Sequence, residues 1–354
     1  MVAHYGRKMN PDRVFWFEEL EQGHSDLVGR KSASLGQMAR MGLPVPPGFA
    51  IPIAMYRRFA EETGIAEEIA HYMAGLGELK GQNIEVFDTS SGHIRSIIEG
   101  KAIPEELRAT IALYYKQMCH RVVTPDVAVS VRSSGKESRP GMFDTYLNVI
   151  GIEDVLDKVK KVWASAYSTR AIAFQVNKDL PVTGEELGIA IPKMVNARSS
   201  GIAFTANPVN GDTSKIIIDA NWGLGEATVG GTVSADKFVV AKENLAVVDA
   251  IIGEKARQVT NERSGVGWED VPPAKRNIPC LSDDEIVAVA RLAKLLEERL
   301  AAPQDVEWAI DAALPFPGSL FLLQTRPVKL AAKAPTSVTD RMVDLIARTF
   351  YKPV

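Results

Sequence analysis

Residues 127–151, VAVSVRSSGKESRPGMFDTYLNVIG, constrain the fold of this chain more than any other stretch. Valines alternate at 127, 129 and 131, which is typical of a strand with a buried face. The segment that follows, as far as Gly141, is rich in Ser, Gly, Lys and Arg, and a second apolar run begins at Tyr146. The pattern predicts a strand that delivers Arg132 into a flexible, cationic turn, where backbone amides beside glycine can approach phosphate oxygens.

The composition excludes several classes of protein. With 354 residues, 46% of them hydrophobic and 24% charged, the chain is long enough for two lobes with cores of their own, and disorder is excluded as its main state. The formal net charge of −3 gives no general basic field that would attract nucleic acid, so any anion must be bound by a local cluster.

The cysteines and the hydropathy pattern indicate the cellular compartment of the protein. Cys119 and Cys280 are far apart and lack metal-ligand spacing, which argues against a disulfide framework and a zinc site. No apolar run approaches the roughly 18 residues of a spanning helix, and the first 17 residues lack a signal-peptide core. We expect a cytoplasmic protein that is neither exported nor membrane-spanning.

The hydrophobic periodicity predicts two unlike lobes and a tail. Residues 1–187 read as largely helical, with the Arg132 strand among the helices, and a sheet-rich texture of short apolar runs begins at Gly188 and continues to residue 330. A late helix begins at Ser282, which with Glu285 has capping-box spacing. Residues 331–354 read as a linker and a small amphipathic helix. The predicted fold class is therefore α+β.

A predicted hairpin over residues 305–328 carries four polar side chains that share one face. Asp305 and Glu307 lie two apart on one strand, and Gln324 and Arg326 lie two apart on the return strand. If the turn between them pairs Glu307 with Gln324, Asp305 falls opposite Arg326. Two carboxylates and an amide oxygen suit Mg²⁺, which prefers oxygen ligands and shares its shell with phosphates. The alternative is a cross-strand salt bridge on a solvated face.

Four separated stretches resemble, in the right order, the ATP-binding domain of the phosphoenolpyruvate synthase and pyruvate phosphate dikinase family. Besides the Arg132 stretch, they are GRKSASLGQMARMGLPVPPGFAIP, DANWGLGEATVGGTVSADKFVV and QDVEWAIDAALPFPGSLFLLQTRPV. The resemblance covers about residues 12–328 and implies a two-lobed ATP-grasp architecture that binds Mg-ATP. It implies that Lys31, Arg132 and Arg326 neutralise phosphates, that Gly141 belongs to the phosphate loop, and that Asp305, Glu307 and Gln324 hold the metal.

Three further residues are carried over from the same family. The resemblance places Lys193 and Met194 on the strand beside the adenine and Glu226, in WGLGE, close to the nucleotide. An ordinary core strand and an ordinary turn are the alternatives. The lysine motif departs from the family's GGKG pattern, because Arg30 stands where glycine is usual.

The resemblance also indicates what is missing. The family's histidine phosphoryl carrier and its pyruvate-binding barrel have no counterpart here, so the chain is either cut out of a longer protein or a separate subunit. We expect a stand-alone ATP-binding subunit that passes the β-phosphoryl to a histidine on a partner subunit, with AMP and phosphate as products. Phenylphosphate synthase is organised in this split way, and the final acceptor, bound by the partner, would be a small molecule such as phenol or pyruvate. A self-sufficient kinase that releases ADP and a non-catalytic ATP sensor are the alternatives.

Overall fold

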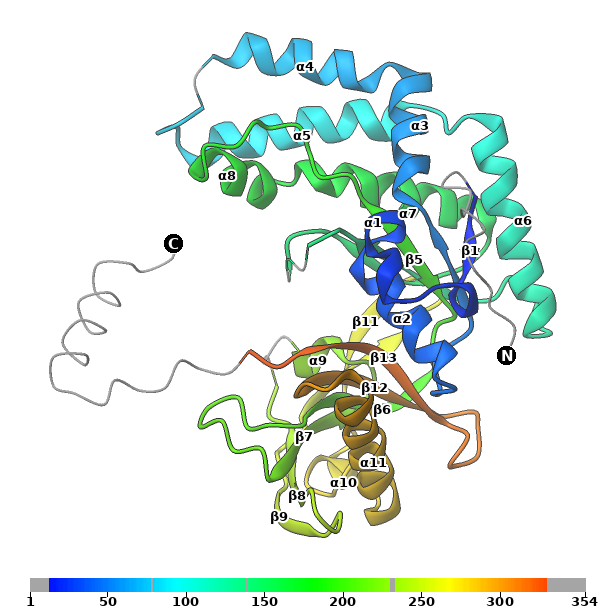
Figure 1. The fold of residues 1–354 in the computed structure, drawn as a ribbon, viewed down its shortest axis with the longest axis vertical. Helices are drawn as coiled ribbons and strands as arrows, with labels where there is room; N and C mark the ends of the chain where they lie inside the picture. Colours follow the sequence, from blue (N-terminus) through cyan, green and yellow to red (C-terminus); the bar gives the residue numbers. More distant parts are fainter. Residues whose placement is uncertain (1–12, 78, 138, 140, 230–232, 330–354) are drawn as a thin grey trace, which may run out of the picture. The chain divides into compact units, whose positions relative to one another are not determined.

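The structure is a computed structural model that describes residues 13–77, 79–137, 139, 141–229 and 233–329, and it divides into two compact units (Figure 1). The first unit comprises the described residues up to Asn196 together with Thr260–Trp268 and Phe321–Gln324. The second comprises Ala197–Val259, Glu269–Leu320 and the described residues from Thr325 onward. Both units mix helices with an antiparallel sheet, which confirms the α+β prediction.

The first unit is built on a five-stranded sheet in the order β1-β2-β5-β3-β4. The strands are β1 (Phe15–Trp16), β2 (Gly48–Ile51), β3 (Val129–Ser134), β4 (Thr145–Val149) and β5 (Gly188–Pro192). Every pair of neighbours runs antiparallel, and β3 lies inside the sheet between β4 and β5. The strand that carries Arg132 is thus fixed on both edges.

Helices surround this sheet and supply most of the core of the first unit. They are α1 (Ser25–Val28), α2 (Arg30–Arg40), α3 (Ile53–Thr63), α4 (Ile65–Leu76), α5 (Ile84–Gly100), α6 (Glu105–Arg121), α7 (Ile152–Ala164) and α8 (Thr169–Asn177), with short 3-10 turns at Phe17–Glu19, Gln22–His24 and Ser165–Tyr167. Helix α7 packs on β3 and β4, α2 packs on β3 and β5, and α5 lies alongside α4, α7 and α8 (Figure 1). At the centre, the fully buried ring of Trp163 stacks on Phe59 with 5.0 Å between centroids.

The second unit is a six-stranded sheet in the order β13-β12-β6-β7-β8-β9. Its strands are β6 (Ala197–Phe204), β7 (Lys215–Trp222), β8 (Asp236–Ala241), β9 (Val247–Ile251), β12 (Gln304–Asp311) and β13 (Leu320–Pro327). The short helices α9 (Glu226–Val229) and α10 (Pro273–Arg276) and the two-stranded ladder of β10 (Arg257–Asn261) and β11 (Val266–Asp270) complete the order of elements. Helix α11 (Asp283–Leu300) packs on β12, β6 and β7.

The capping box predicted at the start of α11 is confirmed. The hydroxyl of Ser282 accepts a hydrogen bond from the amide of Glu285, and the Glu285 carboxylate accepts one from the amide of Ser282 at 2.9 Å. The apolar stripe that follows is buried, from Ile286 through Leu296. Two otherwise unsatisfied amides are thereby paired at the point where the helix turns its apolar face to the sheet.

Two expectations about the first lobe differ from the structure. The expected boundary after residue 187 falls before β5, but β5 pairs with β2 and β3, so the first unit continues to Asn196. Arg132 lies inside β3 and not after it, because Thr145 and Ala190 flank it in the neighbouring strands. The expected terminal helix, in residues 331–354, lies outside the described residues. Cys119 and Cys280 are free thiols, and no described helix is long and apolar enough to cross a bilayer.

Candidate functional site

Two of the predicted motifs meet directly in the first unit, where the start of α2 lies against the end of β3. The amide of Arg30 donates to the carbonyl of Gly135 at 2.9 Å, and the amide of Ser32 donates to the buried hydroxyl of Ser134 at 3.1 Å. Gly29 approaches so closely that a Cβ built there would lie 1.8 Å from the carbonyl oxygen of Ser134. Lys31, between these two contacts, is held at a fixed place beside the Arg132 strand.

These contacts limit how the start of α2 can bind an anion. Two of the first three amides of the helix, those of Arg30 and Ser32, already donate to protein oxygens. Lys31 therefore has its side chain as the main means of reaching a phosphate. Gly29, which precedes Arg30, has φ +78° and ψ 164°, a backbone conformation that other residues avoid.

Arg132 is half-buried, and its guanidinium is oriented by residues of β13 that belong to the same unit. Its Nη1 donates to the carbonyl of Leu323 and its Nη2 to Oε1 of Gln324, both at 3.3 Å. Arg132 and Gln324 were predicted from separate motifs and lie 192 residues apart in the sequence. Both distances lie beyond the usual 2.7–3.2 Å range for N–H···O bonds.

The turn after β3 carries Gly141 at φ +68°, and residues that sequence analysis missed hold it. The guanidinium of Arg139 lies 3.3 Å from the carboxylate of Glu185 and 4.7 Å from the centre of the Phe174 ring. Burial raises the pKa of Glu185, which the charge of Arg139 partly offsets. The same carboxylate lies against Gly135, where a Cβ would come within 2.5 Å of it. Glu185 stands in an ordinary polar stretch, TGEEL, which gave no signal of this contact.

In the second unit the hairpin pairing is confirmed for two of the four residues. Nε of Arg326 donates to Oδ2 of Asp305 at 2.7 Å, and Asp305 is only 7% exposed. Its other oxygen, Oδ1, is buried without a hydrogen-bond partner among the described residues. Burial raises the pKa of Asp305, Arg326 opposes this shift, and the neighbouring charge of Glu307 adds to it. The pair is a cross-strand salt bridge in which the carboxylate is buried and the side chain of Arg326 is 34% exposed.

The residues present fit a magnesium ion. A buried carboxylate oxygen that lacks a donor is a ready ligand for a hard cation, and a cation would also favour the ionised form of Asp305 by opposing the rise of its pKa. Glu307 is half-buried on the same strand, and Gln324 is half-buried on β13, which is hydrogen-bonded to β12. The described residues contain no cluster of three His, Cys, Asp or Glu side chains that could hold a metal by itself.

Lys193 and Met194 follow β5 in the first unit and are half-buried. The amide of Lys193 donates to the carbonyl of Pro47 and that of Met194 to the carbonyl of Ala128, both at 2.8 Å. These two donors are used within the protein, so a base read by backbone groups would have to use other atoms of this segment.

Glu226 is exposed at the start of α9, in the second unit. It follows Gly223, which has φ +73° and at which a Cβ would lie 2.3 Å from the carbonyl oxygen of Val259. This close approach explains one glycine of the WGLGE segment by backbone packing.

Comparison with known proteins gives a consistent result. The family model "Pyruvate phosphate dikinase, AMP/ATP-binding domain" matches residues 25–344. The probable phosphoenolpyruvate synthase of Archaeoglobus fulgidus is 37% identical over 326 residues, which cover 90% of this chain and 42% of that protein. The phosphoenolpyruvate synthase of Aeropyrum pernix is 36% identical over 345 residues, covering 89% of this chain and 42% of that protein. The chain therefore spans less than half the length of these relatives.

Proposed function

Because the chain belongs to the family of the pyruvate phosphate dikinase AMP/ATP-binding domain, we propose that it is the ATP-binding subunit of a dikinase-type phosphotransferase with an ATP-grasp architecture. In this proposal it binds Mg-ATP and passes the β-phosphoryl to a histidine on a separate partner subunit, with AMP and phosphate as products. The final acceptor is a small molecule on the partner, such as phenol, as in a phenylphosphate synthase, or pyruvate.

The contact between Arg132 and Gln324 is the observation that carries the proposal. It joins a cationic fork and an amide oxygen from motifs that lie 192 residues apart in the sequence. Their 3.3 Å separations leave the guanidinium able to turn toward a better acceptor, and phosphate oxygens form shorter, charge-assisted bonds with arginine. Lys31, docked beside the same strand, adds a second positive charge.

The second part of the proposal concerns the hairpin of β12 and β13, which would hold the metal. Asp305, Glu307 and Gln324 would hold Mg²⁺, and Arg326 would neutralise charge on the transferred group while it orients Asp305. When bound, the metal would supply positive charge that offsets the negative charge of the phosphates. The remaining contribution of this chain is positioning and charge stabilisation.

Two other functions make different products. A self-sufficient kinase would phosphorylate a small molecule directly and release ADP, whereas an ATP sensor would bind the nucleotide and consume none. The presence of both acidic residues on β12 favours catalysis over sensing, because a sensor has no need of a complete metal site.

The identity of the nucleotide product tests the proposal. ATP labelled at the β-phosphorus is incubated with the chain alone and with an extract of the native cell, and the label is followed into nucleotides and acid-labile phosphoprotein. We expect AMP, with label on a second polypeptide. ADP as the first product would instead establish the kinase, and bound but unconsumed ATP in both incubations would establish the sensor.

A further inference from the structure

Behind the ion pair of Asp305 and Arg326, a buried hydrogen bond joins the same two strands. Gln304 directly precedes Asp305 on β12, and Thr325 directly precedes Arg326 on β13. Because side chains alternate along a strand, both point to the face of the sheet opposite the ion pair. There the hydroxyl of Thr325 donates to Oε1 of Gln304 at 2.8 Å. Thr325 is 9% exposed and Gln304 is 1% exposed, so the bond is shielded from water.

Gln304 is held in place by further hydrogen bonds. Its backbone amide donates to the hydroxyl of Thr205 at 2.8 Å, and its carbonyl accepts from the amide of Thr205 at 2.9 Å. Its side-chain amide donates to the carbonyl of Ala302 at 2.8 Å. Thr205 directly follows β6 and is fully buried. Since every nitrogen and oxygen of Gln304 has a partner, Oε1 is presented to Thr325 from a fixed position.

The surroundings of this bond are apolar. On β12, Val306 and Trp308 share the face of Gln304, and each is 1% exposed. Two apolar side chains could fill the space of Gln304 and Thr325 without the desolvation cost of a buried amide and hydroxyl. A buried hydrogen bond, by contrast, forms only in one alignment of its two partners. The bond therefore specifies how β13 lies on β12.

The alignment matters because β13 is at the edge of the six-stranded sheet, next to β12 (Figure 1). A shift of β13 by two residues would keep every side chain on its face but move Arg326 by about 7 Å along the strand, away from Asp305. The same shift would bring Leu323 or Pro327 to the place of Thr325, and neither side chain can donate a hydrogen bond. The buried amide oxygen would then lack a donor, so the shifted register is disfavoured.

We propose that Gln304 and Thr325 are positioning residues for phosphoryl transfer, because their bond fixes the register in which Arg326 reaches Asp305. The side chain of Arg326 is long and 34% exposed, so the place of its backbone decides whether the guanidinium makes the 2.7 Å contact. The inference rests on the proposed function, in which this ion pair serves the metal and the transferred group. Gln304 and Thr325 act through the pair and touch neither.

Three variants separate positioning from stability. Thr325→Val keeps the β-branched shape but removes the hydroxyl, which leaves a buried oxygen of Gln304 unsatisfied. The double variant Gln304→Met/Thr325→Val replaces both partners by apolar groups of similar shape, which recovers most of the stability. Thr325→Ser retains the hydroxyl.

The first readout is the rate of phosphoryl transfer from β-labelled ATP in native extract, at saturating ATP. We expect this rate to fall by about tenfold or more in Thr325→Val and in the double variant, because small misplacements of a catalytic group are costly. The ATP concentration for the half-maximal rate should change little, and Thr325→Ser should transfer at nearly the wild-type rate. A merely structural bond predicts that the double variant regains its transfer rate together with its stability.

Hydrogen exchange of the amides of β13, followed by mass spectrometry, is the second readout and needs no substrate. We expect faster exchange over residues 320–327 in Thr325→Val, and we expect it to stay fast in the double variant although stability is recovered. The inference is overturned if exchange in the double variant equals that of the wild type, or if its transfer rate does. A wild-type chain without transfer activity would instead overturn the proposed function and with it the positioning role, while exchange would still decide the register.

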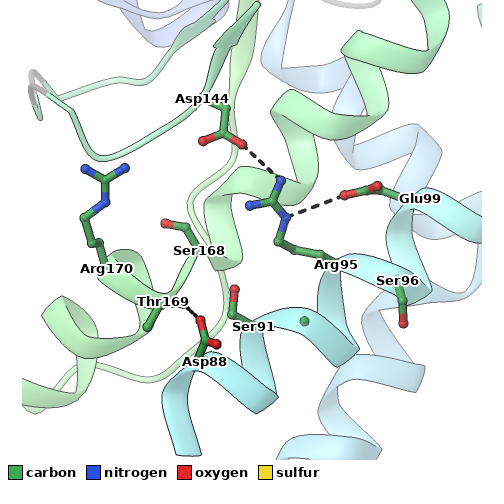
Figure 2. A pocket seen from close by; sticks show the side chains of 10 residues that line it. Asp88, Ser91, Arg95, Ser96, Glu99, Asp144, Ser168, Thr169 and Arg170 are labelled. Carbon is green, nitrogen blue, oxygen red and sulfur yellow. Dashed lines mark hydrogen bonds and ion pairs between the residues drawn. The ribbon is translucent and has the colours of Figure 1, made fainter. Parts of the chain in front are cut away.

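Two variants act as matched controls. Ser199→Ala removes another buried hydroxyl of the same sheet, one that donates to the carbonyl of Cys280 at 2.8 Å. Thr169→Val removes a hydroxyl that donates to the carboxylate of Asp88 at 2.9 Å in the first unit (Figure 2). Both should leave the transfer rate and the exchange of β13 as in the wild type. An equal loss of transfer in either control would show that removing any such hydroxyl suffices, which would also overturn the inference.

Discussion

Two ion pairs inside the second unit have the same chemistry but different surroundings. Asp236 and Lys255 are both 0% exposed, and they meet at 2.5 Å. Asp236 also accepts hydrogen bonds from the amides of Gly253 and Cys280, so both of its oxygens are used. Asp305 pairs with Arg326, yet its Oδ1 has no hydrogen-bond partner among the described residues. A fully satisfied pair has a structural role, whereas a pair with a vacant oxygen can still bind a cation.

The difference has a physical basis in desolvation. Removing a carboxylate from water costs several kcal/mol, and the cost is recovered only when its charge and both oxygens find partners. For Asp236 three donors provide this compensation. For Asp305 the compensation is incomplete, and burial accordingly raises its pKa. The Mg²⁺ of the proposed site is a partner that would complete it.

The largest expected effect concerns the structural pair. Lys255→Met leaves Asp236 buried without its counter-charge, and we expect the free energy of unfolding to fall by about 3–5 kcal/mol. Urea unfolding followed by circular dichroism measures this change. The double variant Asp236→Leu/Lys255→Met should recover much of the loss. A loss below about 1 kcal/mol in the single variant would remove the basis of the comparison.

At the pair of Asp305 and Arg326, we expect a large loss of activity and a smaller loss of stability. Arg326→Ala should lower the rate of phosphoryl transfer by about 10²–10³-fold, as for the loss of one preorganised donor to developing charge. Its cost in stability should be similar to that of Arg198→Ala, which breaks a 2.6 Å pair with the buried Glu285 in the same unit. Equal transfer rates in the two variants would contradict the role of Arg326.

The smallest effect is a dependence on pH without metal. Because the folded-state pKa of Asp305 is raised, the folded protein binds this proton more tightly, and stability falls as pH rises from the usual aspartate pKa of about 3.9 through the raised value. Asp305→Asn removes this loss. We expect the variant to gain stability relative to wild type between acidic and neutral pH in metal-free urea titrations, and a parallel course of the two curves would count against a raised pKa.

Local sequence patterns predicted the features that depend on residue spacing within one helix or one strand. The alternation of side chains on a strand placed Asp305 beside Arg326, and the Ser282–Glu285 spacing located the start of α11. The docking of Gly29 on Ser134 was not predicted, because the closely packed surfaces are about a hundred residues apart and neither has a local signature.

The lack of a local signature also explains the other contacts that the sequence did not predict. The GIAIP run of β5 reads correctly as a strand, but nothing in it says that its partners are β2 and β3 rather than strands of the second unit. Asp236 and Lys255 belong to unremarkable segments, and only the fold brings them together. Contacts of this kind depend on tertiary packing and lie outside the reach of periodicity.

The most direct measurement is ATP affinity with and without Mg²⁺, determined by calorimetry for the wild-type chain and for Asp305→Asn. If Asp305 is a ligand of the metal, Mg²⁺ tightens ATP binding to the wild type. This tightening is lost in Asp305→Asn, which remains folded. A wild-type chain that does not bind ATP, or a variant in which Mg²⁺ tightens binding as strongly as in the wild type, would contradict the account.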